Sequence, residues 1–502
     1  MFQKERYPAL SPRLTRQPAL RALALASALL ALSGASPASA SASVADEIAR
    51  IENGLRPGVV LADVPVATSK LADEMQRLHV PGVSVAVIRN GRIAWARGFG
   101  VTHANGPAVD ERTLFQAASI SKPVTAMAAL KLVEEGKLTL DADINTVLAS
   151  WKLTTADGAP AAASLRQLLS HTAGTSVSGF PGYAAGKPVP ALLQVLDGAA
   201  PANTRAVRVD GPQGSFRYSG GGYSVVQQAL ADRSGRPFDA LLMDTVLKPL
   251  GMTDSSFAQP LPAALQGRAA LPHDRRGQPY AGGAYTYPEL AAAGLWTTPT
   301  DLAKFALEVQ RALNGHGKGV LSQASARTML AVPGKNAGTE KGYALGVQVE
   351  GAGAAASFQH GGSNMGYQNT LFAYTGHGDG AVVLTNGDNG AELAQGLIRA
   401  IAAEYKWPSY QPKTRKAVPL DAARRAALPG RYVTREIGDF TIEERGGQLM
   451  IALRAGQFEP LYAESPDVLF VLSRDADLRM APDGKSGRLV SGAFDIAFQR
   501  AE

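Results

Sequence analysis

The chain has 502 residues, of which 45% are hydrophobic and 19% charged, a composition typical of a globular protein with more than one domain. It contains no cysteine, which excludes disulfides, thiolate metal sites and a lipidated N-terminal cysteine. The formal net charge is +7, but residues 1–40 contribute +4 of it, and no basic stripe with interleaved aromatic residues predicts a nucleic-acid partner.

The first 40 residues have the pattern of a signal peptide. A basic start precedes a small, apolar stretch from Ala22 to Ala35, and Ala38-Ser39-Ala40 is a sequence of the kind that signal peptidase cuts. About 14 apolar residues are too few to span a bilayer. We therefore expect cleavage near residue 40, no stable membrane anchor afterwards, and a periplasmic or extracellular location in a bacterium, which suits an exported chain without cysteine.

In the segment that follows, strands come first and last, and helices fill the middle. The helical patterns cover 45–55, 71–78, 120–132, 223–233, 301–313 and 392–405. Two apolar runs joined by Asn90-Gly91 predict an early hairpin, and strands return between Phe358 and Thr385. Over residues 41–407 this order predicts an α+β domain, in which helices flank an antiparallel sheet built from both ends of the domain.

The pattern changes after Trp407-Pro408. Residues 408–420 hold three prolines and three basic residues and are predicted to be a linker. From residue 421 to 502, short strand patterns alternate with glycine-rich turns, which predicts a small all-β accessory domain.

The sequence Ser119-Ile120-Ser121-Lys122 carries the main functional signal. Ser119 is the only serine in the chain with a lysine three residues later. In a helix that begins here, positions i and i+3 share a face, and the helix N-terminus favours an anion forming nearby. A serine hydroxyl needs an adjacent base to act as a nucleophile. Lys122 is expected to be that base or to assist a second group that is.

The surrounding segments resemble the serine β-lactamase and penicillin-binding-protein superfamily, and more closely its class C β-lactamase-like branch of esterases and D-stereospecific peptidases. The resemblance covers roughly residues 45–405. It rests on Phe115 to Pro123, Leu132 to Leu138, Leu168 to Gly174, Pro249 to Met252 and Gly294 to Pro299. It implies an α+β fold with an all-helical subdomain, catalysis by Ser119 and Lys122, and two further motifs.

The resemblance implies a Lys/His-x-Gly motif on the strand beside the nucleophile, and His360-Gly361-Gly362 fits it. The N–H groups of Ser119 and Ser363 would then form an oxyanion hole, the two glycines would leave room for substrate, and His360 would help to position it.

The motif expected between these two is Tyr-x-Asn, and here the chain departs from the pattern. The best candidate is Tyr218-Ser219-Gly220, in which glycine replaces asparagine; Tyr367-Gln368-Asn369 falls in the wrong order and is taken as coincidence. Tyr218 remains a candidate general base or proton shuttle. Gly220 cannot supply the carboxamide, which argues against efficient amide cleavage more than against ester cleavage.

These observations predict a secreted serine hydrolase that acts on a small-molecule or peptide substrate, with a suspected preference for esters. Two alternatives stay open: a β-lactamase or D-amino-acid peptidase, and a β-lactam-binding receptor that acylates without turnover. No cofactor or metal site is expected, because the acidic residues show no ligand spacing and no phosphate-binding loop is present. His171 is expected to be a locally bonded turn histidine, and Trp296 to lie either in the pocket or in the core.

Overall fold

The computed structural model describes residues 43–317, 319–333, 341–434, 438–454, 457–491 and 494–501. The chain separates into two compact units, residues 1–43 and 44–502, and the account below concerns the second. The predicted signal peptide lies outside the described residues. Within those residues, no helix has both the length and the apolar character needed to cross a membrane.

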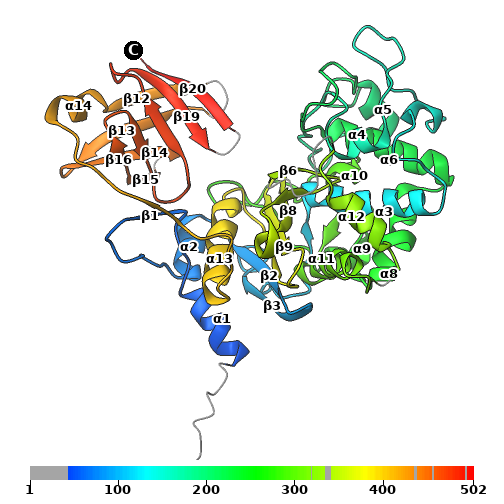
Figure 1. Cartoon of the computed structure of the whole chain (residues 1–502), viewed down its shortest axis with the longest axis horizontal. Helices are drawn as coiled ribbons and strands as arrows, with labels where there is room; N and C mark the ends of the chain where they lie inside the picture. Colours follow the sequence, from blue (N-terminus) through cyan, green and yellow to red (C-terminus); the bar gives the residue numbers. More distant parts are fainter. Residues whose placement is uncertain are drawn as a thin grey trace, which may run out of the picture. The chain divides into compact units, whose positions relative to one another are not determined.

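A seven-stranded antiparallel sheet runs through the larger part of the described chain, in the order β3-β2-β10-β9-β8-β7-β6 (Figure 1). Its strands are β2 (Gly82–Arg89), β3 (Arg92–Gly100), β6 (Lys341–Tyr343), β7 (Gln348–Glu350), β8 (Ser357–Asn364), β9 (Tyr367–Tyr374) and β10 (Gly380–Thr385). The predicted hairpin is present, with Asn90 and Gly91 both at positive φ. Strand β2 pairs with β10, so the two ends of the domain meet in one sheet, as expected.

Both faces of the sheet are covered. Along β2, Val83, Val85 and Val87 face one core, whereas Ala86 and Ile88 face the other, because successive side chains of a strand alternate. Helices α1 and α13 pack on the first face, and helices including α3, α6 and α11 supply the second core. The predicted α+β class, with an antiparallel sheet flanked by helices and a helical subdomain, is confirmed.

Helices predicted from the sequence are found close to their expected bounds. They are α1 (Val44–Glu52), α2 (Leu71–Arg77), α3 (Ser121–Glu134), α6 (Gly220–Ser234), α11 (Pro299–Leu313) and α13 (Gly390–Glu404). Helix α11 has a capped start, because the Thr298 side chain accepts a hydrogen bond from the Asp301 N–H and proline is the first helical residue. The other α-helices are α4 (Leu165–Leu169), α5 (Leu192–Asp197), α7 (Phe238–Leu242), α8 (Lys248–Leu250), α9 (Ala263–Gln266), α10 (Leu290–Ala293), α12 (Gln323–Leu330) and α14 (Ala422–Ala427).

The predicted C-terminal β-domain is a nearly closed antiparallel barrel with a core of its own. Its nine strands in the described residues are β12 (Gly430–Thr434), β13 (Phe440–Arg445), β14 (Gln448–Arg454), β15 (Gln457–Pro460), β16 (Tyr462–Ser465), β17 (Val468–Phe470), β18 (Asp477–Met480), β19 (Ser486–Ser491) and β20 (Phe494–Arg500). Near closure of the barrel reduces the exposed strand edges that would otherwise recruit other chains.

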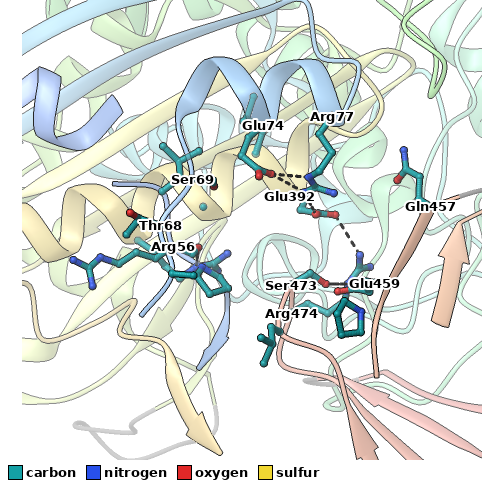
Figure 2. A pocket seen from close by; sticks show the side chains of 18 of the residues that line it. Arg56, Thr68, Ser69, Glu74, Arg77, Glu392, Gln457, Glu459, Ser473 and Arg474 are labelled. Atoms are coloured by element: carbon teal, nitrogen blue, oxygen red, sulfur yellow. Dashed lines mark hydrogen bonds and ion pairs between the residues drawn. The ribbon is translucent and has the colours of Figure 1, made fainter. Parts of the chain in front are cut away.

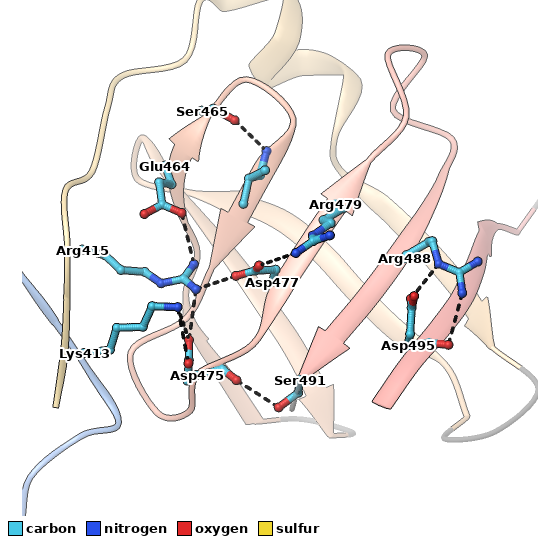
Figure 3. A network of polar contacts seen from close by, with 11 residues as sticks. Lys413, Arg415, Glu464, Ser465, Asp475, Asp477, Arg479, Arg488, Ser491 and Asp495 are labelled. Carbon is cyan, nitrogen blue, oxygen red and sulfur yellow. Dashed lines mark hydrogen bonds and ion pairs between the residues drawn. The ribbon is translucent and has the colours of Figure 1, made fainter. Parts of the chain in front are cut away.

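A short strand lies inside the segment predicted to be a linker. Strand β11 (Lys413–Arg415) pairs in parallel with β1 (Val59–Leu61). Figure 3 shows how Arg415 reaches the barrel, where its guanidinium contacts Glu464, Asp475 and Asp477. The domain boundary predicted at residues 408–420 remains a prediction, and it contains this ordered strand.

Candidate active site

The candidate nucleophile lies in a tight turn before a buried helix. Residues Ala118–Ile120 form a 3-10 turn, η1, that follows strand β4 (Phe115–Gln116) and leads into α3. Ala118 has a φ of 52°, in the left-handed region that non-glycine residues rarely adopt. From Thr113 to Leu130 every residue is buried except Ser119. The strained turn therefore presents this one serine to solvent at a helix N-terminus.

The second serine of the motif has a different task. Ser121 is completely buried, and its hydroxyl donates to the Ala118 carbonyl at 2.6 Å while accepting from the Leu295 N–H at 3.0 Å. These bonds fix the carbonyl of Ala118, the strained residue, and engage the only proton of the Ser121 hydroxyl. Ser121 is thus a structural residue, and Ser119 is the better candidate for a nucleophile.

Lys122 is the buried cation of the site. Lys122 is only 2% exposed. Its Nζ donates to Ser119 Oγ at 3.1 Å and to the Ala292 carbonyl at 2.8 Å. Nζ also lies 5.0 Å from the ring centre of Tyr218 and 5.6 Å from that of Tyr223. The predicted trio of Ser119, Lys122 and Tyr218 is therefore gathered around one nitrogen atom.

An amide side chain fastens the nucleophile turn to the neighbouring strands. Gln116 accepts from Asn364 Nδ2 through its side-chain oxygen and from Asn369 Nδ2 through its backbone carbonyl, both at 2.8 Å. A Cβ placed on Gly362 would lie only 2.1 Å from the Ala117 carbonyl oxygen, so β8 approaches the turn too closely for any side chain there. This contact brings the backbone that precedes Ser363 against the turn that carries Ser119.

His360 is buried, and both of its ring nitrogens have partners. Nδ1 lies 2.6 Å from the Gly361 carbonyl, which can only accept, so Nδ1 carries the proton and Nε2 accepts from the Tyr343 hydroxyl at 2.7 Å. Burial and the charge of Lys122 lower the pKa of His360 to about 3, so the ring is neutral at physiological pH. In this arrangement His360 supports the strand and Tyr343, and it offers no cationic group to a substrate carboxylate.

His171 contacts the candidate second motif, Tyr218-Ser219-Gly220. Its Nδ1 accepts the Ser219 N–H at 3.0 Å, and its ring centre lies 4.2 Å from that of Tyr218 and 4.6 Å from that of Tyr343. Burial first, and then the charge of Lys122, hold the pKa of His171 well below its usual value. The bond that was expected to be local instead crosses to the loop of the second motif, which makes His171 a positioning residue for Tyr218.

The position of the missing asparagine is filled by another side chain. Gly220 is the first residue of α6, and its φ is not in the left-handed region. A Cβ placed there would lie 2.9 Å from Cε2 of Phe180 and 3.3 Å from the Ser178 carbonyl oxygen. The phenyl ring of Phe180 therefore occupies the space into which a side chain at residue 220 would project.

Several site residues were not predicted from the sequence: Gln116, Phe180, Ala292, Tyr343 and Asn364. The partners they contact lie far away in the sequence, and no local spacing marks them. Trp296 is 3% exposed and packs against Tyr367, so it belongs to the core. Asn369 bonds to the nucleophile turn, so the out-of-order Tyr-x-Asn sequence has a structural role. Across the described residues, no group of three or more potential metal ligands is present.

Comparisons with known proteins show which family the chain resembles. A family model described as Beta-lactamase matches residues 67–406. Esterase EstB from Burkholderia gladioli is 28% identical over 323 residues, which cover 58% of this chain and 81% of the esterase. Penicillin-binding protein 4 from Amycolatopsis lactamdurans is 27% identical over 376 residues, covering 70% and 93% of the two chains. The resemblance inferred from the motifs is confirmed.

Among solved structures, the octameric penicillin-binding protein homologue from Pyrococcus abyssi superposes with a TM-score of 0.57 at 22% identity. The match covers 85% of this chain and 98% of that one. At this identity the likeness establishes the fold alone, and the likeness extends well beyond residues 67–406.

Proposed function

We propose, from the premise that this chain belongs to the Beta-lactamase family of serine hydrolases, that it cleaves a carboxylic ester through an acyl-enzyme on Ser119. The observation that carries the proposal is the 3.1 Å contact between Ser119 Oγ and Lys122 Nζ, in a turn where Ser119 alone is open to solvent. A nucleophile within hydrogen-bond reach of its proton acceptor is the arrangement that serine acylation requires.

The reaction proceeds in two balanced halves. Ser119 Oγ forms a bond to the substrate carbonyl carbon while its proton passes to the general base, which is either Lys122 in its unprotonated form or the unprotonated Tyr218 oxygen beside a charged Lys122. The N–H groups of Ser119 and Ser363 stabilise the negative oxygen that develops. The carbon–oxygen bond to the leaving alcohol then breaks, and the alcohol takes up the proton. Water attacks the acyl-enzyme by the same route and releases the carboxylic acid.

The preference for esters is supported by the replacement at Gly220. Glycine provides no carboxamide to bind a substrate amide, and the ring of Phe180 leaves little space for one. Loss of a well-placed hydrogen bond costs about 1–3 kcal/mol, up to roughly a hundredfold in rate. An activated ester needs less assistance than an amide, because its leaving group departs without strong protonation.

The test compares a short-chain aryl ester with a chromogenic cephalosporin on the purified protein. We expect a higher kcat/KM for the ester, complete loss of turnover in Ser119→Ala, and a covalent adduct on Ser119 after labelling with a fluorophosphonate. Ser121→Ala serves as the matched control and should retain the labelling site. Labelling of Ser121 would contradict the assignment of the nucleophile. Faster cephalosporin hydrolysis would favour a β-lactamase, and one equivalent of product without turnover would favour a receptor.

Export to the periplasm or the medium is part of the same proposal, and it rests on the sequence of residues 1–40. N-terminal sequencing of the protein recovered from a bacterial host tests it. A mature chain that begins near residue 41 supports export, and retention of Met1 in the recovered protein contradicts it.

A further inference from the structure

A second pocket, remote in sequence from the nucleophile, contains two arginines whose charges are not balanced. It has a volume of about 400 Å³ and lies between the segment around Arg56, helix α13 and the barrel (Figure 2). Four arginines line it: Arg56, Arg77, Arg399 and Arg474. The close-up shows Arg56, Thr68 and Ser69 together on one side of the pocket, and a chain of ion pairs on another.

Two of the four arginines are neutralised by carboxylates. Arg77 contacts Glu74 and Glu392, each at 2.6 Å, and Arg474 contacts Glu392 at 3.2 Å. Glu459, the remaining acid of the pocket, accepts a hydrogen bond from Ser473, and burial raises its pKa. These contacts form a closed polar network, which explains Arg77 and Arg474 without a ligand.

No carboxylate partner in the described part of the chain accounts for Arg56 and Arg399 in the pocket. Within the described ranges neither forms an ion pair, and Arg56 Nε is a buried donor without a hydrogen-bond partner. Arg399 Nε donates to the Arg56 carbonyl at 2.8 Å, which ties the two residues together and leaves the terminal nitrogens of Arg399 without a carboxylate. Burial lowers the pKa of Arg399 to about 10, and the negative charge of Glu392 offsets only part of this effect.

Uncompensated guanidinium groups in a pocket are costly unless an anion joins them, because a buried charge needs a partner. Arginine presents planar pairs of N–H donors that match the oxygens of carboxylates and phosphates. The four arginines and three glutamates that line the pocket leave one formal positive charge, which a bound oxyanion would balance, and Thr68 and Ser69 add hydroxyl groups to the same wall of the pocket. The volume admits a small molecule and excludes a macromolecule other than by one protruding group.

We propose that this pocket binds a small oxyanion, held by the guanidinium groups of Arg56 and Arg399. A phosphate group and a dicarboxylate share this chemistry. The proposal is independent of the hydrolase function, because it involves no residue of the Ser119 site. Occupation of the pocket would also stabilise the contact between α13 and the barrel, which supplies Arg474 and Ser473 to the opposite wall.

The test measures the thermal unfolding midpoint and the heat of binding of the full-length protein in two arms, with inorganic phosphate and with succinate. Sodium chloride at equal ionic strength is the reference for both arms. We expect a saturable rise of the midpoint with a dissociation constant below about 10 mM, weakened at least about tenfold in Arg399→Gln and in Arg56→Gln. The tighter of the two probes identifies the ligand class.

Arg50→Gln is the matched control, because Arg50 is exposed and already paired with Glu404 at 2.6 Å. It should bind the probe as the wild type does. Without added anion, Arg399→Gln should unfold at no lower temperature than the wild type, since it loses an uncompensated charge. Equal binding by wild type and both pocket variants, a response that chloride reproduces, or no binding of either probe would overturn the proposal. Arg56→Gln keeps the test decisive if Arg399→Gln does not fold.

Discussion

Two buried cations, Lys122 in the candidate active site and Arg415 beside the barrel, have opposite surroundings. Arg415 is 3% exposed and is surrounded by the carboxylates of Glu464, Asp475 and Asp477 (Figure 3). Lys122 is 2% exposed, and among the described residues it contacts a serine hydroxyl, a carbonyl and two aromatic rings, but no carboxylate. A cation paired with acids holds strands together, whereas one that faces a hydroxyl is placed to exchange a proton with it.

Removing each cation in turn tests this contrast between Lys122 and Arg415 most directly. Lys122→Ala should lower the rate of acylation by roughly a hundredfold or more, the usual scale for a positioned proton transfer. Pre-steady-state kinetics with an aryl ester measure it. Arg415→Ala should instead lower the free energy of unfolding by about 2 kcal/mol, because two of its three acids are half-exposed and screened.

The kcat of Arg415→Ala should stay at the wild-type value, which makes it the control for Lys122→Ala. If Arg415→Ala loses acylation while it remains folded, the division between a structural and a chemical cation is wrong.

Tyr218→Phe sharpens the assignment of the proton acceptor. The substitution keeps the ring that packs on His171 and lies near Lys122, and it removes only the hydroxyl. We expect acylation to slow by roughly a hundredfold, with little change in KM. Single-turnover kinetics at several pH values separate the two parameters. Acylation at the wild-type rate would show that Lys122 acts alone and that Tyr218 is not the second motif.

Glu289 extends the comparison to a buried acid without a cation. It is completely buried before α10, neither carboxyl oxygen has a hydrogen-bond partner, and burial raises the pKa to about 7. Below pH 4.5 the group is protonated in both folded and unfolded protein, so its full stability is present. That stability is lost as the pH rises through 7, where the folded protein must hold a buried carboxylate.

The loss should reach about 3 kcal/mol of unfolding free energy at pH 8 or above, and Glu289→Gln should remove it. Urea denaturation at pH 4.5, 6, 7 and 8 measures this dependence in both proteins. Glu111→Gln, at an exposed position, is the control that should keep the wild-type dependence. An unchanged dependence in Glu289→Gln would show that another group causes the loss.

A smaller effect is expected from restoring the asparagine. Gly220→Asn alone meets the ring of Phe180, so we expect little gain in cephalosporin hydrolysis and some loss of stability. The double variant Gly220→Asn with Phe180→Ala provides the space, and it should narrow the ratio of ester to cephalosporin kcat/KM by up to about tenfold. Phe180→Ala alone is the control. If the double variant has the same ratio of ester to cephalosporin kcat/KM as Phe180→Ala alone, Gly220 is not the cause of the preference for esters.

The smallest effect is expected from proteolysis between the α+β domain and the C-terminal barrel. Limited proteolysis should cleave between Trp407 and Leu420, and Lys413 to Arg415 should be cut more slowly than the rest, because these residues are paired with β1. Mass spectrometry of the fragments locates the cuts. Exclusive cleavage outside this segment would contradict the predicted boundary.

The sequence identified the parts of the site that depend on local spacing. Ser119 and Lys122 stand one helical turn apart, and a hairpin, a capped helix and a strand with two glycines each have their own local signals. The same reasoning found the α+β order and the β-rich C-terminal domain, since hydrophobic periodicity reports which faces are buried.

Only the tertiary structure decided which side chains complete the site. The Gln116 contacts with β8 and β9, the Tyr343 bond to His360, the Ala292 carbonyl on Lys122 and the ring of Phe180 over Gly220 all join segments that are distant in the chain. Such contacts depend on how the sheet and helices pack, and no residue spacing encodes them. Ser121 shows the limit: beside Ser119 in the sequence it carries the same hydroxyl, but packing buries it and commits it to the backbone.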